Sequence, residues 1–290
     1  MTKTNTRLGI ILMVLTMIIF ALQDGLSRHL AETYNVLMVV MVRYWFFASF
    51  ALWWAMRNAG GIRGAIATTQ PLLQIFRGVL LALEICVMVL AFTYIGLVES
   101  MAVFAAYPLM VAALSGPVLG EFVGWRRWIA IFVGFIGVLI ILNPTVTVFT
   151  PAALIPLASA SMFALYSLLT RFAARKDPAR VSFLWVGLVG AVVMTVVGIW
   201  YWENMTGFDS VLMAMLCVSG ALAHWLLIKV YETAEASSVQ PFAFLHIVFA
   251  AAVGIFFFNE VLATNVAIGA AIVLAAGLFT VLRERQNLSG

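Results

Sequence analysis

Charged residues are scarce in this chain of 290 residues, where Asp, Glu, Lys and Arg make up 10% of the sequence and apolar residues 64%. Soluble domains carry about a quarter of charged residues. A soluble core cannot bury so much apolar surface, so the composition excludes a soluble enzyme and predicts an all-α polytopic membrane protein. The net charge of +4 does not indicate nucleic-acid binding, because the basic residues are spread over loops.

Cysteine and histidine are rare as well, with two and three residues in the chain. Cys86 and Cys217 lie in apolar segments and are predicted to be buried thiols rather than a disulfide. Neither the cysteines nor the histidines show the spacing of metal ligands, so we expect no metal site and no cofactor.

Apolar runs of membrane-spanning length, by contrast, fill the sequence. Breakers such as Gly60-Gly61 and Asp177-Pro178 lie between them. Since a span needs about 20 residues, we predict ten transmembrane helices. They are expected at 8–30, 36–57, 72–93, 98–116, 126–143, 151–172, 181–202, 210–231, 237–258 and 264–283.

One motif occurs twice along the chain. Phe-Ala-Leu-Gln at 20–23 recurs as Phe-Ala-Leu-Tyr at 163–166, and an arginine follows each copy, Arg28 or Arg171. Near the end of each half a glutamate closes an apolar run. Five spans per half is an odd number, so the two copies must be inverted in the bilayer, an arrangement common in secondary transporters. We therefore predict two inverted five-helix repeats, 1–146 and 147–290.

The basic residues predict the orientation of these spans. Of 16 Lys and Arg residues, all but Arg28 and Arg43 fall in segments on the same side as the termini. Basic loops stay in the cytoplasm. Both termini are therefore expected to be cytoplasmic.

Several segments resemble the drug/metabolite transporter superfamily. They are the repeated Phe-Ala-Leu motif, Arg43 opening 43–47 and Arg77 opening 77–83. Pro108 to Glu121, followed by Gly137, is similar to the EamA-type repeat, and Glu260 with Gly269 match it in the second half. Ile247 stands where that pattern favours proline.

The resemblance implies an alternating-access transporter in the bacterial inner membrane, a monomer or weak homodimer with the lipid bilayer and a small-molecule substrate as its partners. The similar type exports aromatic amino acids, so export of amino acids, including aromatic and hydrophobic ones, is expected. Export or import of another small metabolite or a drug is the alternative. Coupling to protons, or none, stays open. We expect no enzyme, because no cluster of acids or phosphate motif is visible at one interface.

Ionisable residues inside spans cost about 3 kcal/mol to insert, so each is a candidate for function. Glu84 and His224 lie at equivalent positions of spans 3 and 8. They are predicted to line a central cavity and to bind charged groups or relay a proton, with a structural hydrogen bond or ion pair that only fixes helix packing as the alternative. The further cavity candidates are His246, Trp225, Tyr107, Tyr166, Gln23 and Phe163. For His246 the alternative is an interior histidine bonded to a backbone carbonyl, and for the aromatic residues it is ordinary packing.

Other residues are expected to act on gating or structure. Asp24, Arg43 and Glu99 are predicted to form ion pairs near the outer mouth. Glu121 and Glu260 are expected to satisfy backbone donors at the starts of spans 5 and 10. The remaining structural candidates are Pro108, which can kink its helix, and Gly137 and Gly269, which permit close helix packing within the fold or in a dimer.

Overall fold

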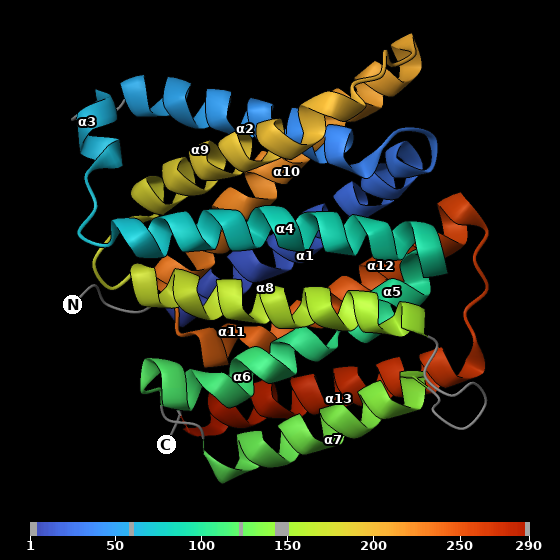
Figure 1. Cartoon of the computed structure of the whole chain (residues 1–290). Helices are drawn as coiled ribbons and strands as arrows, with labels where there is room; N and C mark the ends of the chain where they lie inside the picture. The colour runs from blue at the N-terminus through green and yellow to red at the C-terminus, as the bar shows by residue number, and fades with distance from the viewer. Residues whose placement is uncertain (1–4, 58–60, 122–123, 143–150, 288–290) are drawn as a thin grey trace.

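The computed structural model describes residues 5–57, 61–121, 124–142 and 151–287, and the regular elements in these ranges are all helices (Figure 1). The α-helices are α1 (Thr6–Thr33), α2 (Val36–Arg57), α3 (Gly61–Ile66), α4 (Pro71–Ile95), α5 (Leu97–Phe104), α6 (Ala106–Leu119), α7 (Trp125–Leu142), α8 (Leu154–Ala173), α9 (Ala179–Gly198), α10 (Gly207–Thr233), α11 (Ala236–Ala243), α12 (Leu245–Phe258) and α13 (Thr264–Asn287). Two 3-10 turns, η1 (Pro151–Ala153) and η2 (Ile199–Tyr201), precede α8 and follow α9.

Eight helical segments in the described residues are long and apolar enough to cross a membrane. They are α1, α2, α4, α8, α9, α10 and the composite segments Leu97–Leu119 and Ser238–Phe258. The polytopic, all-helical class is therefore confirmed. Ten spans and cytoplasmic termini stay predictions, as does the boundary between 146 and 147, which lies outside the described residues.

The helices pack in pairs that fit the predicted repeats. α1 packs on α10 as α8 packs on α4, while α2 packs on α9 and α7 on α13. The predicted repeats make α8 the counterpart of α1 and α10 the counterpart of α4. Replacing each helix of a pair by its counterpart therefore gives the other pair or the same pair. In Figure 1 α7 and α13 lie together along the lower side of the bundle and α2 and α9 along the upper side. α1 begins and α13 ends at the same end of the bundle, here called the termini end, and the opposite end is called the far end.

Two spans are broken near their middle. Ala105 separates α5 from α6, and Phe244 separates α11 from α12. Pro108 has no N–H for the carbonyl of Phe104 four residues earlier, which ends α5 there. Ile247 stands at the equivalent place in the second half, where its N–H bonds the carbonyl of Phe244 at 3.2 Å. The second break therefore forms without a proline at that position.

Both broken spans end in the same backbone geometry. Gly120 (φ 68°) and Asn259 (φ 53°) adopt the left-handed conformation after α6 and α12. The N–H of Glu121 then bonds Ser115 O at 3.3 Å, and the N–H of Glu260 bonds Gly254 O at 3.2 Å. This hydrogen bond across the left-handed residue is typical of helix C-termini. The two glutamates thus leave their helices in equivalent directions.

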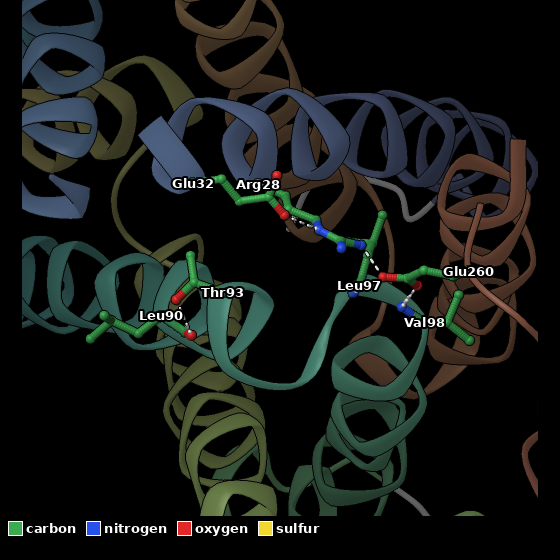
Figure 2. A network of polar contacts seen from close by, with 7 residues as sticks. All are labelled: Arg28, Glu32, Leu90, Thr93, Leu97, Val98 and Glu260. Atoms are coloured by element: carbon green, nitrogen blue, oxygen red, sulfur yellow. Dashed lines mark hydrogen bonds and ion pairs between the residues drawn. The ribbon is translucent and has the colours of Figure 1, made fainter. Parts of the chain in front are cut away.

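Glu260 joins three elements at the far end, as Figure 2 shows. Its Oε1 accepts a hydrogen bond from the backbone N–H of Leu97 (2.9 Å) and its Oε2 accepts one from Val98 (2.7 Å). Arg28 of α1 forms an ion pair with the same carboxylate and bonds Glu32 at 2.9 Å. The carboxylate therefore caps the start of α5 and fixes it to α1. We call this group the Arg28–Glu260 clasp.

The equivalent contact occurs at the termini end and is called the Arg171–Glu121 clasp. Arg171 Nε lies 3.3 Å from Glu121 Oε1, and the backbone N–H of Ala236 donates to the same oxygen at 3.3 Å. Arg171 also donates to the carbonyl of Tyr231 at 2.9 Å. Glu121 thus caps the start of α11.

The sequence placed the donors of Glu260 at the start of the span that follows it. The structure gives this carboxylate the backbone N–H groups of Leu97 and Val98, at the start of α5 in the other half. For Glu121 the structure adds a donor of α11, again in the other half. The physical reason is the short first segment of each broken span, whose unpaired N–H groups face the end of the other broken span.

Replacing Glu260 by Gln is expected to lower the free energy of unfolding by about 1–2 kcal/mol, because the capping charge and the ion pair with Arg28 are lost. Thermal unfolding of the purified protein in detergent measures this. Glu99→Gln is the matched control, since Glu99 is exposed in the first turn of the same helix α5. Equal stability of the two variants would contradict the capping role.

Candidate functional site

A central pocket lies between the two halves of the bundle, with a cavity volume of about 40 Å³ in this conformation. Helices α1, α2, α4, α5, α8, α10 and α12 contribute to its wall. From α1 the lining residues run from Phe20 to Ser27, and from α4 they run from Glu84 to Phe92. Both helices approach the far end along these stretches. The pocket therefore extends from the middle of the bundle towards the far end.

Two carboxylates lie in the pocket wall. Asp24 Oδ2 is 2.8 Å from His246 Nε2, and Glu84 Oε1 accepts a hydrogen bond from Ser159 Oγ at 2.6 Å. All four side chains are buried. Within the described ranges the second oxygen of each carboxylate has no hydrogen-bond donor. These oxygens are available to a cationic or hydrogen-bonding solute.

Arg43 brings a guanidinium to the same pocket from α2. Its Nη2 donates to Gln23 Oε1 at 2.9 Å and lies 3.4 Å from His224 Nε2. Gly220 of α10 leaves the room that the guanidinium needs, because a Cβ at that position would lie 2.6 Å from Arg43 Nε. The arginine is thus fixed between α1 and α10.

Aromatic rings form the apolar part of the wall. The ring of Phe20 lies 5.3 Å from that of His224 and 5.7 Å from that of His246, centroid to centroid. Phe104 and Phe163 are 5.5 Å apart. Rings at these distances provide flat apolar surface beside the charged groups.

On the termini side of the pocket the bundle is filled by hydrogen-bonded side chains. The fully buried Arg77 donates to Thr170 (2.9 Å), Gln74 (2.5 Å) and Ser182 (3.1 Å). Gln74 in turn donates to Asp177 at 2.7 Å. This network joins α4 to α8 and α9.

Many of the predicted site residues meet in the pocket. Those that line it are Glu84, His224, His246, Gln23 and Phe163, together with Asp24 and Arg43. The predicted ion pairs among Asp24, Arg43 and Glu99 are absent from the described part of the chain. Asp24 instead faces His246, for which a backbone carbonyl was the alternative partner, and Glu99 is exposed outside the pocket.

Three predicted aromatic residues lie elsewhere. Trp225 packs on Trp54 (4.4 Å between ring centroids) and borders an apolar groove between α2 and α10. Tyr166 is buried with its ring 5.4 Å from the guanidinium carbon of Arg77. Tyr107 lies behind Phe163, at 4.9 Å. Helix packing turns all three away from the central space.

The structure adds residues that the sequence reasoning did not select. Phe20 and Ser27 precede and follow Gln23 and Asp24 on α1 and share their helix face at spacings of three, four and seven residues. Helical periodicity could have revealed them. Ser159, the partner of Glu84, has no comparable signal because α8 carries several serines.

Residues 7–143 match the family model described as the EamA-like transporter family. The first half of the chain is therefore similar to an EamA-like transporter domain. Among curated relatives, the S-adenosylmethionine uptake transporter of Rickettsia prowazekii is 27% identical over 281 residues, covering 97% of this chain and 95% of the relative. The riboflavin transporter of Vibrio cholerae is 29% identical over 231 residues, covering 78% of this chain and 77% of the relative.

A solved crystal structure shares the fold beyond the EamA domain, with a TM-score of 0.70, 15% sequence identity and 97% coverage of both chains. At that identity the likeness shows the fold alone. Both relatives are named as transporters, and neither is named for an amino acid.

Cysteine labelling can test where the pocket opens. Ser27→Cys lines the pocket towards the far end, is 2% exposed in this conformation, and is expected to react with a water-soluble thiol reagent when the far end opens. Ser167→Cys, buried in α8 away from the pocket, is expected to stay unmodified. The wild-type protein, labelled in parallel, gives the baseline for Cys86 and Cys217. Mass spectrometry measures the extent of modification. If Ser27→Cys stayed as unmodified as Ser167→Cys, the pocket would have no access from the far end.

Proposed function

We propose that this protein is an uptake carrier for a small metabolite that combines a heteroaromatic ring with charged groups, with S-adenosylmethionine as the first candidate. The observation that carries the proposal is the central pocket, where two carboxylates, one guanidinium and a phenylalanine wall meet. Relatives named for S-adenosylmethionine uptake align with nearly the whole chain.

The chemistry of this solute matches the pocket group by group. S-adenosylmethionine carries a sulfonium, an ammonium, a carboxylate and an adenine ring. Asp24 and Glu84 offer carboxylate oxygens to the cationic groups, and Phe20, Phe104 and Phe163 offer flat surface to the ring. Riboflavin has a ring but no cationic group, so it would leave these carboxylates without charged partners.

Amino acids are the competing class of solute. A pocket with carboxylates and a guanidinium also suits an ammonium and a carboxylate on one small molecule. An aromatic amino acid would place its ring against the same phenylalanines. The test must therefore include phenylalanine beside the metabolites.

We infer that the protein works by alternating access between the two predicted repeats, 1–146 and 147–290. The support is the pair of equivalent clasps, Arg28–Glu260 at the far end and Arg171–Glu121 at the termini end. Each clasp joins one repeat to the other, so breaking one while keeping the other would open a single end. With cytoplasmic termini, the far end would face the outside.

Counterflow in liposomes tests the solute. Vesicles containing the purified protein are loaded with unlabelled S-adenosylmethionine, riboflavin or phenylalanine and are then given labelled S-adenosylmethionine. We expect saturable exchange with the first and little with the others. Exchange of phenylalanine alone, measured with its own label, would overturn the proposal in favour of an amino acid carrier.

Glu84→Gln is expected to reduce exchange at least about tenfold, because a cation loses a charged partner in a site shielded from water. Initial rates of counterflow measure the effect, and Glu99→Gln, outside the pocket, is the matched control. Unchanged transport in Glu84→Gln, in protein that unfolds at the wild-type temperature, would remove Glu84 from the site.

A further inference from the structure

Arg43 is a buried cation without a carboxylate partner at ion-pair distance in the described ranges. The side chain is 4% exposed, and its printed contacts, with Gln23 and His224, both use Nη2. Nε and Nη1 have no acceptor in the same ranges. A guanidinium offers five N–H donors, so most of its capacity is unused in a site where water is scarce.

His224 also has an N–H donor without an acceptor. A guanidinium nitrogen can only donate, so His224 Nε2, 3.4 Å from Arg43 Nη2, must accept, which places the ring proton on Nδ1. That Nδ1 atom is buried and has no hydrogen-bond partner. Two neighbouring side chains of the pocket thus hold unused N–H donors, Nδ1 of His224 and Nη1 of Arg43, and the positive charge of Arg43 favours an anionic acceptor for them.

The surroundings hold this pair in place. Gln23 accepts from Arg43 on one side, and Gly220 lies against its Nε on the other. Phe47 stacks on the ring of His224 at 6.2 Å, with 20° between the planes. Both donors are therefore oriented before any solute binds, which reduces the entropy lost on binding.

We propose that Arg43 and His224 form an anion subsite that binds the carboxylate of the transported solute. Asp24 and Glu84, in the same pocket, take its cationic groups. This proposal rests on the proposed function, because it assigns binding partners to the carboxylate of the same solute. It makes the pocket selective for zwitterions over purely cationic molecules of the same shape.

A purely structural Arg43 would behave differently. Its charge would then be balanced at longer range by Asp24 and Glu84, and its loss would weaken folding or the binding of every solute alike. A subsite instead changes the ratio of affinities for two ligands that differ only in the carboxylate. That ratio is the quantity to measure.

The experiment is isothermal titration of the full-length protein in detergent with S-adenosylmethionine and with its decarboxylated analogue. The wild type is expected to bind the carboxylate form about tenfold more tightly, as for a hydrogen-bonded charge pair. In Arg43→Gln the ratio is expected to fall to about twofold or less, mainly through weaker binding of the carboxylate form.

Gly220→Ala is a second variant that keeps every charge. Its methyl group would displace the guanidinium, so the ratio is expected to fall here too, even if Arg43→Gln does not fold. Arg77→Lys is the matched control, because Arg77 is an equally buried arginine outside the pocket, and the wild-type ratio is expected.

The outcomes separate the two proposals. If the wild type binds both ligands equally, or if Arg43→Gln and Gly220→Ala keep the wild-type ratio, the subsite is wrong while the proposed function stands. If folded wild-type protein binds neither ligand, the proposed function fails and the subsite fails with it.

Discussion

The structure depends on one constraint, that backbone N–H groups freed inside an apolar bundle must find acceptors within the protein. The two broken spans free such groups at the starts of α5 and α11. Glu260 satisfies those of α5, and Glu121 satisfies one at α11. Because each glutamate serves the other half of the chain, the caps also join the halves. Arg28 and Arg171 then neutralise the carboxylates and attach α1 and α8 to the same points.

The breaks also determine what lies at the centre. Phe104 is the last residue of α5 and His246 is the second residue of α12, so both site residues stand at a break. His246 meets Asp24 of α1 there, at the middle of the bundle. A continuous helix would have placed these side chains on another part of its surface. The same interruptions that require the capping glutamates therefore position part of the pocket wall.

The pocket combines charges that apolar surroundings make costly to bury. Such groups are retained in membrane proteins mainly where they face a polar cavity or a partner. Here Asp24 contacts His246 and Glu84 contacts Ser159. Neither carboxylate lies within ion-pair distance of Arg43, which contacts Gln23. The wall keeps its positive and negative groups apart, which suits a solute that carries both charges. The match to the EamA-like transporter family over residues 7–143 indicates a transporter but does not identify the solute.

Part of the fold and of the site could be predicted directly from the sequence. The apolar runs predicted the helices because a span needs about 20 residues whatever its neighbours. Glu84, His224 and Arg43 stood out because ionisable residues in such runs are expensive. The tertiary structure alone decided which groups meet: Ser159 beside Glu84 and the N-terminus of α5 beside Glu260. Those contacts join residues far apart in the chain, and local composition carries no information about which helices face one another.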